Sequence, residues 1–345
     1  MDYKELSHIT INNKQFSKEE ILIMPINGES HLDDVFRFLK SWFDENKNIP
    51  VQTSGSTGKP KQISIPKQSF VESAMNTYDY LKLGEQTKAL LCIPVKYIGG
   101  KMMVIRALVA GYNLVVQEPS SSPLLNSSEK INFIALTPMQ AKNSLDNYPI
   151  EFEKIDKVII GGGAVSEEFI KEIESLKNTI YSTFGMTETV SHIALRTLNG
   201  ENRTDFYQVF PAYSISKNEN NCLVIACPTL SSETITTNDI VEIKDSSFKF
   251  LGRLDNVINT GGIKVFPEEI EKNLAPFMKG ETFYITSKKD ELLGEKVVLI
   301  SENKTIKLKE IKTKNHGLSS YSFPKEMLIK KIELTESGKI MRRKY

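Results

Sequence analysis

The strongest chemical signal in the sequence is a short segment rich in hydroxyls, glycines and lysines. Thr53–Lys61 reads Thr-Ser-Gly-Ser-Thr-Gly-Lys-Pro-Lys. Glycines allow close backbone approach, hydroxyls donate hydrogen bonds and lysines supply charge, so this composition suits a loop that wraps a polyphosphate. The segment is not a Walker A loop, because Gly55 and Gly58 stand too close together and Pro60 follows Lys59. A Ser/Gly linker with solvated lysines is the alternative.

A second segment joins an aromatic ring, a glycine and a carboxylate. Phe184–Glu188 reads Phe-Gly-Met-Thr-Glu. A glutamate beside a threonine can hold Mg²⁺ through its carboxylate while the hydroxyl contacts phosphate. Phe184 could stack on a purine. The alternative is a strand end whose phenylalanine lies in the core.

Two later segments carry weaker signals. Within Gly252–Val265, Arg253 could bind ribose hydroxyls or phosphate, and Gly261–Gly262 could let a thin ligand chain pass. An interdomain turn followed by a β-hairpin explains this stretch equally well. Near the C-terminus, Lys339 follows a glycine, and such a lysine is usually a solvated surface charge.

Strand–helix units supply the frame for these segments. The β-branched run Lys157–Ile160 ends on three glycines, and Ser166 then offers an N-cap for a helix with one apolar face formed by Phe169, Ile170, Ile173 and Leu176. Phe133–Leu136 likewise leads into the cap and first-turn proline Thr137–Pro138. Such alternation predicts an α/β domain with much parallel sheet.

After about residue 210 the strand–helix pattern gives way to short strands separated by turns. Short strands are expected at 222–226, 240–243 and 248–251, with a hairpin corner at Asp245–Ser247. Pro267 and the acids after it predict a helix start. The sequence therefore predicts a large domain over residues 1–254, built on a mixed, mostly parallel sheet with helices plus a small antiparallel unit. A small α+β domain over 255–345 follows it.

Composition narrows the class of protein. The chain has 345 residues, 40% hydrophobic and 25% charged, and 44 basic residues balance 43 acidic ones. A net charge of +1 gives no field that would attract nucleic acid. Three cysteines without a Cys-x-x-Cys pattern and four scattered histidines argue against structural zinc. Lys96, Lys101 and Arg106 interrupt the most apolar stretch, so no membrane span is expected and the protein is expected to be cytoplasmic.

Taken in order, the four segments resemble those of the acyl-CoA synthetase, adenylation-domain and luciferase superfamily, from about residue 50 to the end. The resemblance implies an enzyme that uses ATP and Mg²⁺ to convert a carboxylic acid into an acyl-AMP and then transfers the acyl group to coenzyme A. Lys339, Thr187 and Glu188 are the implied catalytic residues, with Glu188 as the metal ligand and Asp255 as the hinge between domains. The implied nucleotide and coenzyme A contacts are Thr53, Ser54, Gly55, Ser56, Thr57, Gly58, Lys59, Lys61, Gly162, Gly163, Phe184, Gly185, Met186, Asp239, Arg253, Gly261, Gly262 and Lys264.

The sequence departs from the usual pattern of that superfamily at several places. Phe184 stands where tyrosine is common, Asn238 replaces a turn glycine before Asp239, and Tyr97 replaces a histidine. The proline that usually precedes the lysine segment is absent. The phosphate loop also begins unusually near the N-terminus, which implies a shortened first subdomain.

This brevity and the segments at 96–101 and 185–192 look most like the short o-succinylbenzoate–CoA ligases of menaquinone biosynthesis. The resemblance places Tyr97, Gly100, Lys101 and His192 at the acyl site. A substrate with a second carboxylate needs a cationic or multi-donor partner, and the candidates by position are Lys96, Lys101, Arg106 and Lys142. Three alternatives remain: another carboxylic acid, a carrier-protein substrate in place of coenzyme A, and a non-catalytic nucleotide-binding homologue. The oligomeric state is left open, with a homodimer as one candidate.

Overall fold

The computed structural model describes residues 1–52, 62–123, 130–227, 234–278, 280–314, 317–334 and 340–345. The described chain divides into two compact units. Unit 1 comprises Met1–Val165, Ile173–Ser214 and Ala226–Thr234. Unit 2 comprises Ser166–Glu172, Ile215–Ile225 and Ile235–Tyr345.

Unit 1 is built on a mixed, mostly parallel sheet in the order β11-β10-β9-β8-β7-β5-β6-β1-β2. The six strands from β9 to β1 run parallel, whereas β10, β11 and β2 pair antiparallel with their neighbours. A separate antiparallel hairpin pairs β3 with β4. The strands are β1 His8–Ile11, β2 Lys14–Ser17, β3 Asn48–Gln52, β4 Gln62–Pro66, β5 Lys88–Leu91, β6 Asn113–Val116, β7 Phe133–Leu136, β8 Lys157–Ile160, β9 Thr179–Gly185, β10 His192–Thr197 and β11 Tyr207–Val209.

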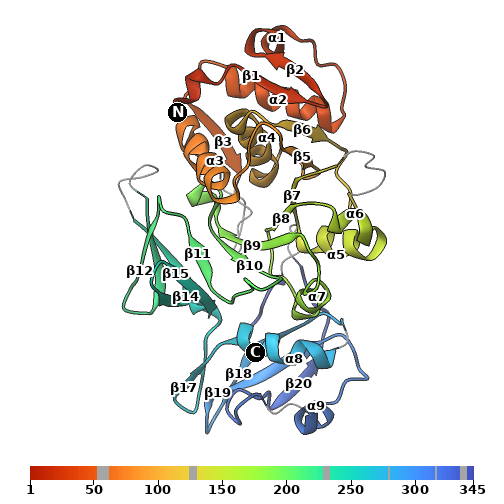
Figure 1. Cartoon of the computed structure of the whole chain (residues 1–345). Coiled ribbons are helices and arrows are strands. Elements are labelled where there is room, and N and C mark those ends of the chain that lie inside the picture. The colour runs from red at the N-terminus through yellow and green to blue at the C-terminus, as the bar shows by residue number, and fades with distance from the viewer. Residues whose placement is uncertain (53–61, 124–129, 228–233, 279, 315–316, 335–339) are drawn as a thin grey trace. The chain divides into compact units, whose positions relative to one another are not determined.

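Helices connect and cover these strands. α3 and α4 pack against each other beside the red-to-brown strands in Figure 1. Thr137 caps α5 as expected, because its hydroxyl accepts the backbone N–H of Gln140 at 3.2 Å. The helical elements are η1 Tyr3–Glu5, α1 Lys18–Ile23, α2 His31–Phe43, α3 Lys67–Leu81, α4 Ile98–Ala110, α5 Pro138–Asn147, α6 Pro149–Glu153 and η2 Thr187–Thr189.

Unit 2 contains two sheets. The antiparallel strands β13, β14 and β15 continue from β12, and a second sheet runs β17-β16-β19-β18 with β20 parallel to β19. Its elements are α7 Glu167–Glu172, β12 Ser214–Lys217, β13 Cys222–Ala226, β14 Ile235–Lys244, β15 Ser247–Arg253, η3 Leu254–Asn256, β16 Ile258–Thr260, β17 Ile263–Val265, α8 Pro267–Met278, β18 Phe283–Asp290, β19 Gly294–Ser301, α9 Leu308–Lys314 and β20 Glu326–Ile329.

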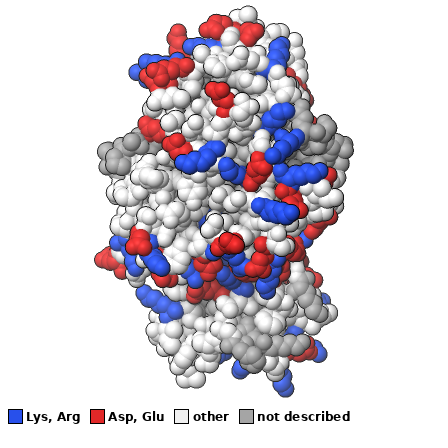
Figure 2. Space-filling model, viewed as in Figure 1, with Lys and Arg blue, Asp and Glu red and all other residues white. Residues whose placement is uncertain are grey.

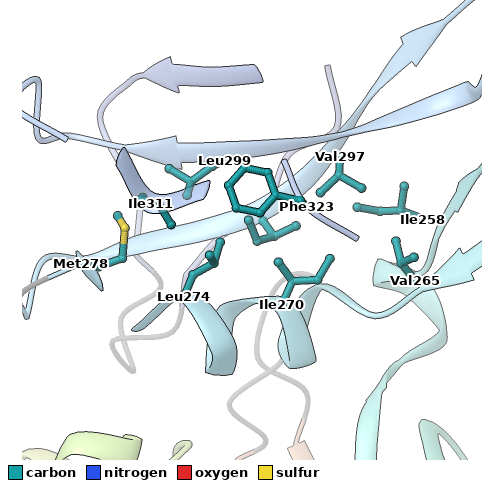
Figure 3. Packing of buried hydrophobic residues seen from close by; sticks show 10 residues of the cluster. Ile258, Val265, Ile270, Leu274, Met278, Val297, Leu299, Ile311 and Phe323 are labelled. Carbon is teal, nitrogen blue, oxygen red and sulfur yellow. The ribbon is translucent and has the colours of Figure 1, made fainter. Parts of the chain in front are cut away.

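The second sheet of unit 2 has its own apolar core (Figure 3). Ile270, Leu274 and Met278 project from one side of α8 toward Val297 and Leu299 of β19. The i, i+4, i+8 spacing of the three helix residues is that of an amphipathic helix lying on a sheet. This core fixes α8 against the strands and therefore fixes any polar side chain that α8 carries.

The predicted fold class is confirmed, and the strands expected at 133–136, 157–160 and 222–226 form as β7, β8 and β13. The helix expected after Ser166 ends at Glu172, four residues short of Leu176. Acidic and basic side chains are interspersed on the face drawn in Figure 2, as expected for a net charge near zero. Within the described ranges, every helix is too short or too polar to cross a bilayer.

Candidate functional site

Several of the predicted ligand-binding residues follow neighbouring strands of unit 1. β8 and β9 are parallel, with Ile160 opposite Ser182, so Gly161–Gly163 and Gly185 emerge at the same edge of the sheet. Gly162 has φ +83°, a conformation that favours glycine. A Cβ on Gly161 would lie 2.5 Å from the Thr183 hydroxyl. These glycines therefore leave bare backbone at the carboxyl edge, where α/β sheets bind ligands.

The turn after β9 is tightly built. A Cβ on Gly185 would lie 2.4 Å from the carbonyl oxygen of Ser191, so no other residue fits without moving the backbone. The Thr189 hydroxyl accepts the N–H of Met186 at 3.0 Å and donates to the Ser191 carbonyl at 2.8 Å. These contacts hold η2 and the start of β10 in one arrangement.

Val190 gives this turn an unusual backbone conformation. Its φ and ψ are +65° and −49°, and the N–H of Ser191 donates to the Thr189 carbonyl at 2.7 Å. This is a γ-turn centred on a β-branched residue, an arrangement that is rare and strained. Strain of this kind persists where the surroundings over-determine the backbone and clusters at functional sites. The turn thus sets the relative positions of Glu188 and Ser191.

Glu188 supplies the carboxylate of this turn, the group through which the turn could bind Mg²⁺. Its side chain is exposed on η2, and the described residues contain no cluster of three metal-ligating side chains. A single carboxylate fits Mg²⁺, which retains waters and is commonly held by one or two carboxylates together with substrate phosphates. The site suits a metal that arrives with a nucleotide.

The ring of Phe184 is half-buried beside a second aromatic residue. Its centroid lies 5.7 Å from that of Tyr207, in an edge-on arrangement. The Tyr207 hydroxyl lies 3.0 Å from the Ser182 hydroxyl, and the Arg196 guanidinium lies 5.3 Å from the Tyr207 ring. Sequence reasoning missed Tyr207, which has no motif of its own and reaches Phe184 only through the pairing of β9, β10 and β11.

A buried guanidinium contacts Ser191, the residue at the end of the η2 turn. Arg106 of α4 donates to the hydroxyls of Ser191 at 2.8 Å and Thr77 at 3.3 Å, and its Nη2 lies 3.4 Å from Nδ1 of His192. In the described part of the chain, the partner of the Nη1 nitrogen is the Met103 sulfur, at 3.9 Å. Among the described residues no carboxylate pairs with Arg106, although its exposed fraction is 3%. A buried cation with neutral partners is costly, so the arrangement favours binding of an anion.

The pKa shifts agree with this geometry. Burial lowers the pKa of Arg106 to about 10, which still leaves the guanidinium charged at neutral pH. Burial and the charge of Arg106 lower the pKa of His192 well below its usual 6.5. The imidazole is therefore neutral, and its Nε2 lies 3.1 Å from the Thr77 hydroxyl.

The structure separates Arg106 from the other candidate cations. Lys101 Nζ donates to the Val95 carbonyl at 2.6 Å and lies 5.5 Å from the Phe38 ring, and burial lowers its pKa. Lys142 is half-exposed and pairs with Asp146 at 2.5 Å. Lys96 is exposed, with its Nζ 5.0 Å from the ring of Tyr97. Arg106 is the candidate that combines deep burial with the absence of a described carboxylate partner.

The N-terminus of α4 is packed too closely for side chains at some positions. A Cβ on Gly100 would lie 2.4 Å from the Pro94 carbonyl oxygen, so Gly100 permits close contact with the preceding segment. Tyr97 is the N-cap residue and remains 53% exposed. Of the four residues expected at the acyl site, His192 lies beside the Arg106 guanidinium, whereas the Lys101 ammonium donates to main-chain carbonyls.

A polar network in unit 2 contains the predicted ribose and hinge residues. Asp239 on β14 lies opposite Arg253 on β15, and Arg253 Nη1 donates to Asp239 at 3.2 Å. Arg253 Nη2 donates to Asp255 at 2.9 Å, and the Asn238 amide donates to the same carboxylate at 3.2 Å. Burial raises the pKa of Asp239 although Arg253 opposes it. Arg253 thus links the candidate ribose residue to the candidate hinge, and Asn238, which replaces the expected glycine, adds a second donor to the hinge carboxylate.

The two glycines after β16 form the turn of a hairpin. Gly261 and Gly262 have φ +59° and +80°, and Thr260 pairs with Ile263. Positive φ at both central residues is the signature of a type I′ turn. Lys264 is exposed on β17.

The strongest sequence signal and the predicted catalytic lysine lie outside the described residues. These are Thr53, Ser54, Gly55, Ser56, Thr57, Gly58, Lys59 and Lys61 in the predicted phosphate loop, and Lys339. Their flanks are described. β3 and β4 pair from Asn48–Pro66 to Gln52–Gln62, and Leu334 pairs with Ile340. Each segment is therefore joined to paired backbone on both sides.

Comparisons with known proteins identify relatives of this chain. Residues 50–211 match the family described as AMP-binding enzyme. The 2-succinylbenzoate–CoA ligase of Listeria monocytogenes is 24% identical over 336 residues, covering 89% of this chain and 71% of that protein. A crystal structure of an acyl-CoA synthetase (AMP-forming)/AMP-acid ligase II-like protein from Dyadobacter fermentans is 32% identical with a TM-score of 0.66, covering 94% and 96% of the two chains.

The fold comparison extends to a structure with a bound intermediate. The o-succinylbenzoate CoA synthetase of Bacillus subtilis, in complex with its acyl-adenylate, has a TM-score of 0.73 at 19% identity, over 84% of this chain and 67% of that one. At this identity the likeness shows a shared fold.

Proposed function

This chain belongs to the adenylate-forming superfamily, and from that premise we propose that it is an AMP-forming acid–CoA ligase whose acid is o-succinylbenzoate. The reaction uses ATP, Mg²⁺ and coenzyme A. A carboxylate is a poor electrophile, so its oxygen first attacks the α-phosphorus of ATP and pyrophosphate leaves. The thiol of coenzyme A then attacks the acyl-AMP carbonyl, and AMP leaves.

The residues of unit 1 serve the first step. Charge gathers on phosphoryl oxygens in the transition state, so positioning and electrostatic stabilisation carry most of the catalysis. Glu188 would hold Mg²⁺, which neutralises phosphate charge, and Thr187 would donate to a phosphate oxygen. Gly162, Gly163 and Phe184 line the adenine, and Thr53–Lys61 binds the departing pyrophosphate.

The residues of unit 2 lie on both sides of the proposed hinge at Asp255 and serve both steps. Asp239 accepts hydrogen bonds from the ribose, beside Arg253. Lys339 bridges the acyl carboxylate and the α-phosphate during adenylation. Movement about Asp255 then withdraws Lys339 and brings Gly261–Lys264 to the coenzyme A channel, as in a hinge-bending enzyme. On this proposal residues 1–254 and 255–345 are the two moving domains.

The observation that carries the choice of acid is the buried Arg106. A substrate with two carboxylates leaves one of them unreacted, and that group needs a charge-assisted partner. Arg106 supplies the charge, while Ser191 and Thr77 hold its guanidinium in place. The names of the relatives from Listeria and Bacillus point to the same acid.

An exchange assay over a panel of carboxylic acids tests this proposal. The enzyme should catalyse ATP–pyrophosphate exchange with o-succinylbenzoate at least about tenfold faster than with benzoate, acetate or octanoate, since one charged hydrogen bond is worth about 1.5–3 kcal/mol. Mass spectrometry should then identify the CoA thioester. Exchange with another acid alone would overturn the substrate assignment, and exchange with none would overturn the proposed activity.

A further inference from the structure

The backbone on either side of residues 335–339 is tied together at one point. Leu334 and Ile340 form an antiparallel bridge, and the N–H of Met341 donates to the Glu333 carbonyl at 2.9 Å. Lys339 immediately precedes the bridged Ile340. Whatever fixes the residues after Ile340 therefore also fixes Ile340, the described residue next to Lys339 in the chain.

A largely buried ion pair fixes those residues to α8. Arg342 Nη2 donates to Glu271 Oε2 at 2.7 Å, and Nη1 donates to Oε1, so the guanidinium holds both carboxylate oxygens. The same carboxylate accepts the N–H of Ile285 at 2.6 Å, and Arg342 Nη1 donates to the Ile285 carbonyl at 3.1 Å. One side chain of α8 thus joins the C-terminal segment to β18.

The surroundings of this ion pair restrict the position of the backbone at Arg342. Only 22% of the Arg342 side chain and 17% of the Glu271 side chain are exposed. Burial raises the pKa of Glu271 although Arg342 opposes it. Burial acts to lower the pKa of Arg342, but its bonds to Glu271 outweigh this and raise that pKa overall. A bidentate pair with little solvent around it permits few alternative positions of the backbone at Arg342.

The remaining C-terminal contacts support the same geometry. The Thr286 hydroxyl donates to the Arg343 carbonyl at 2.7 Å, and the Tyr345 N–H donates to the Ser287 carbonyl at 2.9 Å. Ile340 and Tyr345 pack against the buried cluster that contains Tyr284 and Val298. Arg342 is thus the charged member of a continuous attachment to β18.

We propose that Glu271 and Arg342 are positioning residues for adenylation, holding the chain that bears Lys339 in register with the second sheet of unit 2. This inference rests on the proposed function of Lys339. Arg342 follows Lys339 by three positions, a span of at most about 11 Å, so a shift at Arg342 is passed along the chain to the lysine. Thioester formation, in which Lys339 is withdrawn, does not depend on this register.

Two variants test the proposal by separate measurement of the half-reactions. Arg342→Lys retains the charge but loses the planar fork. The double variant Glu271→Leu/Arg342→Met removes both charges together and leaves no buried charge unpaired. Because a misplacement of about 1 Å can reduce rate about 100-fold, kcat for ATP–pyrophosphate exchange with o-succinylbenzoate should fall about 10- to 100-fold. The KM values and the rate of thioester formation from supplied acyl-AMP should stay within about threefold.

Arg343→Ala is the matched control. Arg343 is the adjacent residue, and its ion pair with Glu333 is exposed at both ends, so exchange should stay within about twofold. If the double variant fails to show a cooperative melting transition, Arg342→Lys decides the outcome. Equal loss in both half-reactions, or unchanged exchange in a folded variant, would overturn the positioning role. Absence of exchange in the unmodified enzyme would instead overturn the proposed function.

Discussion

At the scale of single residues, the proposed role of Arg106 is to distinguish a dicarboxylate substrate from other acids. Replacement Arg106→Met should raise the KM for o-succinylbenzoate about 10- to 100-fold, because it removes a charged hydrogen bond worth about 1.5–3 kcal/mol. Exchange with 4-oxo-4-phenylbutanoate, which lacks the ring carboxylate, should change little. Steady-state exchange kinetics with both acids measure this contrast. An equal loss with both acids would show that Arg106 supports the local fold and does not bind the second carboxylate.

His192 should give the protein a measurable dependence of stability on pH. In the unfolded chain a histidine takes up a proton near pH 6.5, whereas the lowered pKa of His192 keeps the folded imidazole neutral at that pH. The unfolded state then binds more protons, so stability falls as the pH decreases below about 6.5, by up to about 1.4 kcal/mol per pH unit.

The variant His192→Gln should flatten this dependence. Thermal unfolding midpoints at several values between about pH 5 and about pH 7 provide the measurement. A residual slope is expected, because burial also lowers the pKa of His31. Identical slopes for the two proteins would mean that His192 does not control acid stability.

At the scale of secondary-structure elements, a buried lysine holds the base of the hairpin that flanks the proposed phosphate loop. Lys67 begins α3 directly after β4, and its fully buried Nζ donates to the Asp44 carboxylate at 2.9 Å and the Asp44 carbonyl at 3.0 Å. The Lys67 N–H also donates to the Lys47 carbonyl at 2.8 Å, next to β3. These bonds join the end of α2 to both strands of the hairpin.

The two members of this ion pair should respond differently to truncation. Asp44→Ala leaves a buried ammonium without its counter-charge and should cost about 3 kcal/mol. Lys67→Met keeps the apolar packing and leaves a carboxylate that is 37% exposed and can be rehydrated, so it should cost about 1–2 kcal/mol. Urea unfolding measures both, with the half-exposed Lys142–Asp146 pair as a control worth less than about 0.5 kcal/mol. The reverse order would contradict the burial argument.

Local sequence signals predicted the helices and strands better than they predicted the candidate site around Val190 and Arg106. The apolar runs at 133–136 and 157–160 and the proline at 267 act through neighbours in the chain, and β7, β8 and α8 form there. The γ-turn at Val190 opposes the preference of a β-branched residue, so no local rule could predict it. Arg106 could not be ranked above Lys96 or Lys142 because burial depends on tertiary packing, although a lone arginine in the apolar helix α4 was a usable signal.

At the scale of the whole molecule, the proposed mechanism assigns each half-reaction a different use of Lys339. Lys339→Ala should reduce adenylate formation about 100- to 1,000-fold, the usual cost of removing one group that stabilises charge in a transition state. Thioester formation from supplied acyl-AMP and coenzyme A should remain within about threefold, because the lysine is withdrawn in that step. Lys331→Ala, at an exposed lysine of the same unit, should alter neither rate.

The variants of the C-terminal segment should therefore form a graded series. The ratio of adenylation rate to thioester rate should fall most in Lys339→Ala, less in Arg342→Lys and hardly at all in Arg343→Ala. This order follows from how each side chain acts. Lys339 would contact the reacting groups, Arg342 acts only through the backbone that carries Lys339, and the ion pair of Arg343 is exposed. If Lys339→Ala slowed both steps equally, the lysine would serve the fold or a shared binding event, and a two-step use of unit 2 would have to be abandoned.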